Sequence, residues 1–130
     1  MCIEIVIILL PLKEEMVLSA KFWRYLFILY VALLFILSVW SKPVVDYNKF
    51  PGEDKLIHFG AYFLGTILFE RARNGKMNKL LRVIIVFFII MPIITELIQS
   101  FYPDREMNLL DALSGYAGII VGWFFMKRTA

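Results

Sequence analysis

The feature that most constrains this chain is its content of apolar runs of membrane-spanning length. Residues 22–40, FWRYLFILYVALLFILSVW, form a run long enough to cross a bilayer, with aromatic residues near both ends where a helix would meet the membrane surfaces. Across all 130 residues, 61% are hydrophobic and 16% aromatic, and the mean hydropathy is +0.75, which exceeds an ordinary globular composition. The sequence therefore predicts an integral membrane protein.

Three further apolar segments follow and predict an all-α bundle of four membrane helices, folded as a single domain over residues 1–130. We place the membrane spans at about 22–40, 55–70, 82–101 and 108–126. The second span has an apolar part that is short for a full crossing, so we expect local thinning of the bilayer or burial of its polar first turn.

The N-terminal residues 1–21 are not predicted to cross the membrane. Their apolar run, Ile5–Leu10, ends at Pro11 and is far below the roughly 20 residues that a crossing needs. We expect an interfacial segment here, and the true start of the chain stays open between Met1 and Met16.

Basic residues at the ends of the apolar segments predict the orientation. The short connection after the second span and the start of the third carry Arg71, Arg73, Lys76, Lys79 and Arg82. By the positive-inside rule this connection is cytoplasmic, which makes the protein N-in and C-in. The net charge of +3 and pI near 9.1 do not indicate nucleic-acid binding, because the basic residues lie at the ends of apolar runs, as membrane orientation requires.

Polar residues gather at the opposite, outer face of the predicted bundle. They come from the start of the second span, the end of the third, the following turn and the start of the fourth: Asp54, Lys55, His58, Glu96, Gln99, Arg105 and Asp111. Charged groups at membrane depth are costly and usually face a bundle interior or a wet cavity. We therefore predict that His58, Glu96, Arg105 and Asp111 meet in one pocket supplied by different helix ends.

Two sequence features would help the helices to approach one another near this pocket. Pro92 lies one turn before Glu96 and predicts a kink. Small residues at four-residue spacing, Ser114, Gly118 and Gly122, predict a stripe on the fourth span that docks on the second or third span.

The joint pattern resembles the VanZ-like family of small bacterial membrane proteins. The resemblance covers about residues 54–122 and lies in Asp54-Lys55-x-x-His58-Phe59, Glu96-x-x-Gln99, Pro103-x-Arg105, and Asp111 with Gly115 and Gly118. It implies a multi-pass bundle of a few helices in the bacterial plasma (inner) membrane and, as for the founding member, low-level resistance to the glycopeptide teicoplanin. Family members often carry Asn at the positions of Ser114 or Gly115 and Gly at the position of Asp104.

The first functional hypothesis is a pocket that binds, and modifies or moves, an anionic envelope lipid or lipid-linked sugar. Lys55 and Arg105 would hold a phosphate, with Asp54 and Gln99 as further substrate contacts. The candidates for catalysis are His58, Glu96 and Asp111, with proton exchange assigned to Glu96 and His58. The sequence does not decide whether the protein is an enzyme.

Two alternatives stay open. The first is a metal- or proton-dependent transporter component, although the wide separation of His58, Glu96 and Asp111 gives no ligand-spacing signature, so no metal site is predicted from spacing. The second is a scaffold without catalysis, in which the polar residues form a structural network. One cysteine, Cys2, excludes an intramolecular disulfide, and the sequence specifies no cofactor and no oligomeric state.

Overall fold

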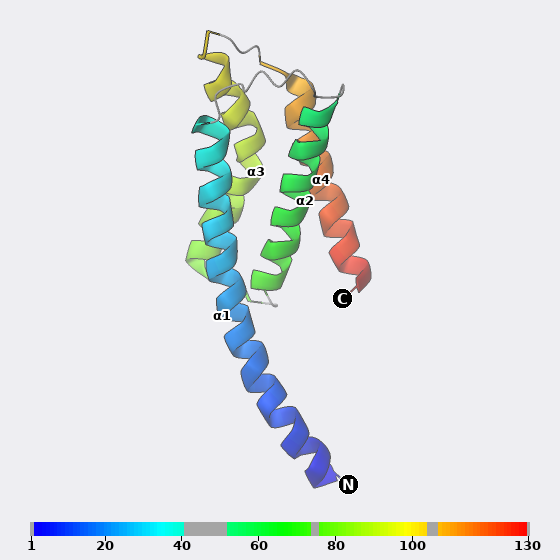
Figure 1. Cartoon of the computed structure of the whole chain (residues 1–130). Coiled ribbons are helices and arrows are strands. Elements are labelled where there is room, and N and C mark those ends of the chain that lie inside the picture. Colours follow the sequence, from blue (N-terminus) through cyan, green and yellow to red (C-terminus); the bar gives the residue numbers. More distant parts are fainter. Residues whose placement is uncertain (1, 41–51, 74–75, 104–106, 130) are drawn as a thin grey trace.

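The computed structural model is a bundle of four helices (Figure 1). It describes residues 2–40, 52–73, 76–103 and 107–129. The helices are α1 Cys2–Trp40, α2 Glu53–Arg73, α3 Lys79–Ser100 and α4 Leu109–Thr129. The all-α fold of four helices predicted from the sequence is confirmed.

Among the described residues, three helices are long and apolar enough to cross a membrane, namely Ala20–Trp40, Lys79–Ser100 and Leu109–Arg128. They correspond to three of the four predicted spans. The helix α2 is not among them, because its first and last turns are rich in charged residues and leave a short apolar stretch between them. It nevertheless runs alongside the other helices and packs against both α1 and α4 (Figure 1).

The first helix is longer than the sequence suggested. It begins at Cys2 and continues through Pro11 to Trp40, so its N-terminal part extends beyond the other helices (Figure 1). Residues 1–21 were expected to form a segment apart from the first span, and the helix instead joins the two. The helix therefore continues through a proline, although a proline removes one backbone hydrogen bond.

Local sequence signals explain where the other helices begin. Gly52 has φ 90°, a left-handed conformation that suits glycine, and its carbonyl accepts a hydrogen bond from the Leu56 N–H at 3.1 Å in the first turn of α2. Asn78 caps α3, because its side-chain oxygen accepts from the Leu81 N–H at 2.8 Å. Asn108 caps α4 in the same way, because its side-chain oxygen accepts from the Leu110 N–H.

Aromatic residues fill the core between α1, α2 and α3. The ring of Phe27 lies 5.5 Å from that of Phe69 and 5.8 Å from that of Phe88, and Tyr62 lies 5.3 Å from Phe88. All four side chains are buried. Such edge-to-face and tilted pairs add about 0.5–1.5 kcal/mol each beyond burial of their area.

The stripe of small residues on α4 packs against α2, the second span, which is one of the two partners predicted for it. Gly118 lies directly over the Phe59 carbonyl, and a Cβ atom there would also be 3.0 Å from the Phe63 nitrogen. Gly122 approaches Thr66 and the Phe63 carbonyl in the same way, with distances of 3.0 and 3.1 Å from such a Cβ. Backbone contact of this kind is possible only where side chains are absent, and it holds the first turn of α4 next to the first turns of α2.

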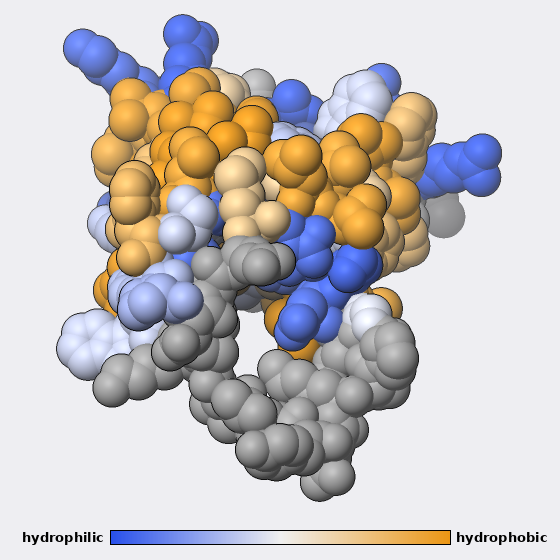
Figure 2. Space-filling view, turned by 90° about the horizontal axis from the view of Figure 1, so that it is seen from above, coloured by the Kyte–Doolittle hydropathy of each residue, from blue (hydrophilic) through white to orange (hydrophobic). Residues whose placement is uncertain are grey.

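The outer surface of the bundle is largely apolar. Large hydrophobic side chains are exposed on all four helices, for example Leu37, Leu56, Ile90 and Phe124. Figure 2 views the molecule from the top of Figure 1 and shows hydrophobic side chains over most of the coloured surface, with hydrophilic ones near its centre and projecting at its edges. A soluble monomer rarely exposes so much contiguous apolar surface, whereas a membrane protein exposes it to lipid.

Candidate functional site

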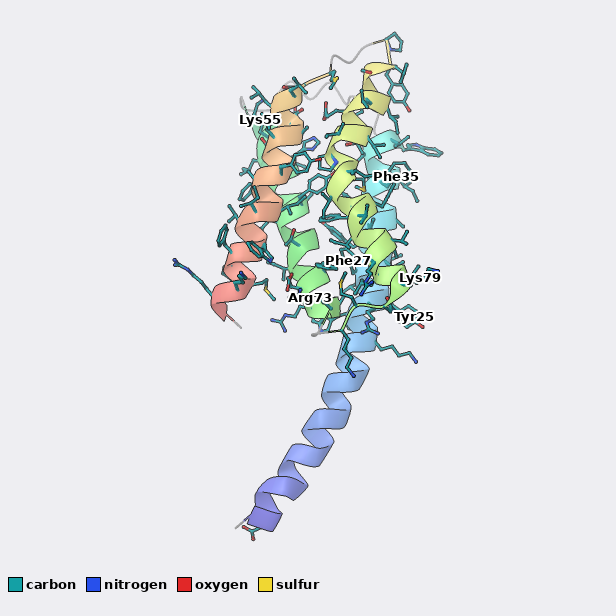
Figure 3. The ribbon with its side chains drawn as sticks, turned by 180° about the vertical axis from the view of Figure 1, so that it is seen from behind. Tyr25, Phe27, Phe35, Lys55, Arg73 and Lys79 are labelled. Atoms are coloured by element: carbon teal, nitrogen blue, oxygen red, sulfur yellow. The ribbon has the colours of Figure 1, made fainter. Side chains whose placement is uncertain are left out.

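Three helix ends meet at the end of the bundle that lies at the top of Figure 1. These are the start of α2, the end of α3 and the start of α4. In Figure 3, Lys55 marks this end, and Arg73 and Lys79 lie at the opposite one. In the part of the chain that the structure describes, the predicted site residues thus lie at the opposite end of the bundle from the basic connection.

The structure brings three of the predicted site residues together. His58, Glu96 and Asp111 each offer one ligating atom, and these atoms all lie within 4.8 Å of one another. Glu96 is buried, with 1% of its surface exposed, and His58 and Asp111 are half-buried. We call these three residues the polar cluster. The spacing of these residues along the sequence does not by itself show that they converge, because each lies on a different helix.

Glu96 holds the beginning of α4. Its Oε2 accepts a hydrogen bond from the backbone N–H of Asn108 at 3.1 Å. Asn108 in turn caps α4: its side-chain oxygen accepts from the Leu110 N–H at 3.1 Å, and its carbonyl accepts from the Asp111 N–H at 3.0 Å. A carboxylate is stabilised at a helix N-terminus by the unpaired N–H groups and the helix dipole.

Lys55 lies beside the cluster and forms an ion pair with it. Its Nζ is 3.7 Å from Asp111 Oδ1, a separation longer than a direct hydrogen bond. The Lys55 side chain is 39% exposed and that of Asp111 is 14% exposed. The oxygen Asp111 Oδ1 is buried and has no hydrogen-bond partner among the described residues. The ammonium group is therefore close enough to compensate charge and mobile enough to bind another anion.

The remaining predicted residues are placed differently. Gln99 donates its Nε2 hydrogen to the Ser38 carbonyl at 2.9 Å, which ties the end of α3 to the end of α1. Tyr102 makes a parallel contact, since its hydroxyl donates to the Val39 carbonyl at 2.9 Å. The amide nitrogen of Gln99 is thus used within the fold.

Asp54 is exposed in the first turn of α2. Arg105 lies outside the described residues, so its predicted place in the pocket stays a prediction. The same holds for a substrate-binding role of Asp54 and Gln99.

Sequence reasoning missed three residues that support the cluster. Asn108 carried a readable signal, because an Asn directly before an apolar run is typical of a helix cap. Thr95 and Tyr62 carried none: both are buried, and a hydrogen bond joins their side chains next to Glu96. Polar groups without charge inside apolar helices are common, and only the structure shows which of them share one location.

The cluster can perform three kinds of chemistry. Two carboxylates with an imidazole can exchange protons, the same three groups can bind a cation, and the adjacent ammonium can bind a phosphate. Comparison of the chain with protein-family models, curated proteins and solved structures finds no match. The resemblance to the VanZ-like family therefore stays a prediction that rests on the residues quoted for it.

Proposed function

We propose that the chain is a multi-pass membrane protein of the bacterial cell envelope that binds the anionic headgroup of a membrane lipid or lipid-linked sugar through Lys55, which lies beside the polar cluster. The observation that carries this proposal is the convergence of His58, Glu96 and Asp111 within 4.8 Å, with Lys55 beside them. A charged residue at membrane depth costs about 2.5–3.5 kcal/mol on insertion scales. In a protein with so apolar a surface, several charged groups lie together only where they stabilise one another or bind a polar ligand.

The direction in which the cluster faces follows from the positive-inside rule. Basic residues at the other end of the bundle are Lys21, Arg24, Arg71, Arg73, Lys76, Lys79, Lys127 and Arg128. This end is proposed to be cytoplasmic, which gives an N-in and C-in protein with the cluster at the outer leaflet. Headgroups of envelope lipids and lipid-linked sugars are available at that depth.

Lys55 is proposed as the phosphate-binding group. Its ion pair with Asp111 is long, at 3.7 Å, and its side chain is partly exposed, so its ammonium can turn towards a headgroup at little cost. Arg105 is the predicted second phosphate contact. His58 and Glu96 are proposed to exchange protons with the bound headgroup, since an imidazole and a carboxylate are the side chains that most often act as general acids and bases.

The cellular test uses Glu96→Gln in a host whose resistance to teicoplanin depends on this chain. Gln has nearly the same shape and keeps an oxygen that can accept from the Asn108 N–H, so the variant should fold, reach the membrane and melt near the wild-type temperature. We expect it to lose the resistance. The matched control is Glu70→Gln, which removes a carboxylate paired with Arg73 at the opposite end (3.1 Å) and should keep it.

Two outcomes would contradict the proposal. Full resistance with Glu96→Gln would mean that the carboxylate has no functional part. A Glu96→Gln protein that fails to accumulate or melts far below wild type would favour the scaffold alternative, in which Glu96 serves only to hold the start of α4.

A further inference from the structure

The polar cluster also has the donor set of a metal site, and we propose that His58, Glu96 and Asp111 together bind one divalent transition-metal ion of the Zn²⁺ type. Each residue contributes one atom, an imidazole nitrogen or a carboxylate oxygen, and the three atoms lie within 4.8 Å of one another. This inference goes beyond the proposed lipid function and does not depend on it, because metal binding can be measured without any lipid substrate.

The geometry is open by a small amount relative to a metal-bound site. Ligand atoms about 2.0–2.2 Å from a tetrahedral Zn²⁺ lie roughly 3.3–3.6 Å apart. The three atoms of the cluster lie within 4.8 Å of one another, so they would need to close by at most roughly 1.2–1.5 Å, which side-chain rotation can provide. Three protein ligands leave a fourth position for water or for an oxygen of a bound phosphate, as in catalytic zinc sites.

One of the three proposed ligands, Glu96, is held in place by an outer hydrogen bond. The Asn108 N–H donates to Glu96 Oε2 at 3.1 Å and so fixes this carboxylate by a backbone group. Such outer hydrogen bonds hold metal ligands in place and are a regular part of metal sites. Burial of Glu96 and half-burial of the other two ligands shield the site while leaving it reachable from the end of the bundle.

Charge also favours a divalent ion. Two carboxylates this close repel each other when both are ionised, and the nearby Lys55 ammonium offsets only one negative charge. A divalent cation would offset both. Lys55 lies 3.7 Å from Asp111 Oδ1 and is partly exposed, so it can turn away when the ion binds.

The donor atoms select the class of metal. One nitrogen and two oxygens suit Zn²⁺, Mn²⁺, Fe²⁺ or Co²⁺, whereas Ca²⁺ and Mg²⁺ prefer oxygen ligands alone and in larger number. Cu⁺ and iron–sulfur clusters prefer sulfur. The one cysteine of the chain, Cys2, belongs to the N-terminal end of α1, far from the cluster (Figure 1).

The test measures Zn²⁺ binding to the purified full chain, carried in detergent without a polyhistidine tag, by titration calorimetry and by metal analysis after dialysis. We expect one Zn²⁺ per chain. His58→Ala, Glu96→Gln and Asp111→Asn should each weaken binding by at least about tenfold, since even outer-sphere changes commonly cost that much. Glu70→Gln is the matched control and should bind like wild type.

Two further readouts keep the test decisive if a variant folds poorly. Co²⁺ as a probe should give visible absorption bands in the wild type that change with His58→Ala, because this variant removes the nitrogen ligand. Zn²⁺ should also raise the melting temperature of the wild type and of Lys55→Gln, but not that of Asp111→Asn.

The results separate this inference from the proposed function. No Zn²⁺ or Co²⁺ binding by folded wild type, or equal binding by all three ligand variants and wild type, would overturn the metal site and leave the lipid proposal to its own tests. Retention of Zn²⁺ by Lys55→Gln supports the metal site, because Lys55 is not a ligand.

Discussion

Lys55 is the residue whose role can be tested apart from the folding of the protein. Its ion pair with Asp111 is long and its side chain is partly exposed, so removing its charge should change stability by no more than about 1 kcal/mol. We predict that Lys55→Gln retains several-fold less phosphatidylglycerol than wild type when the detergent-purified protein is analysed by native mass spectrometry, because its ammonium is the proposed phosphate contact. The control ligand is diacylglycerol, which has no phosphate and whose retention should not change.

The matched control is Lys127→Gln, which removes the same charge at the opposite end, where Lys127 Nζ lies 4.2 Å from the centre of the Trp123 ring. Equal loss of phosphatidylglycerol in both variants would mean that anionic lipids bind through net charge and not at the cluster.

Single residues differ in how far sequence predicts them. Glu96 was identifiable because a carboxylate inside an apolar run is costly, and His58 and Asp111 followed once the helix order placed them at the same end. The partner of Gln99 was not identifiable. Its bond to the Ser38 carbonyl depends on the register between α1 and α3, and no local pattern records that register.

The packing of α4 on α2 is the contact that positions Asp111, and it rests on glycine. A side chain at Gly118 would collide with the Phe59 carbonyl, whereas a Cβ at Gly60 has nothing within 4 Å. We predict that Gly118→Leu lowers stability by roughly 1–3 kcal/mol or more, the usual cost of overpacking, while Gly60→Leu leaves it unchanged or raised. Thermal melting in detergent compares the two variants, which make the same substitution in a helix. Equal melting temperatures would mean that the helices do not touch through the stripe.

At the level of helices, the sequence predicted the number and approximate bounds but not every contact. The glycines at four-residue spacing predicted a close contact between two helices. They did not predict whether the partner was the second or the third span, because a stripe without side chains can pack against the backbone of either. The sequence did not predict that α1 continues through Pro11, because the apolar run before this proline is too short to cross a membrane and a proline removes a backbone hydrogen bond. The helix α2 formed as predicted, but its charged ends keep it outside the three apolar helices of spanning length found among the described residues.

The two ends of the bundle differ in the charged residues that they carry, and the proposed orientation and function rest on this difference. At one end, Arg24 donates through Nε to the Ala72 carbonyl at 3.1 Å and through a terminal nitrogen to the Lys76 carbonyl at 3.4 Å, and Arg71 lies 5.5 Å from the centre of the Trp23 ring. At the other end lie the polar cluster and Lys55 (Figure 3). Sequence could predict this polarity because charge and helix order suffice for it, but the orientation in the membrane needs a measurement.

The central claim is a membrane-embedded cluster that opens to the outside of the cell, and cysteine labelling tests it most directly. In a Cys2→Ser background, Met107→Cys places an exposed thiol near the cluster, and Lys76→Cys places one at the basic end. With a membrane-impermeant maleimide, we predict that intact cells label Met107→Cys at once and label Lys76→Cys only after permeabilisation, because basic connections stay in the cytoplasm. Labelling of Lys76→Cys in intact cells, with Met107→Cys protected until permeabilisation, would place the cluster on the cytoplasmic side and contradict the proposed function.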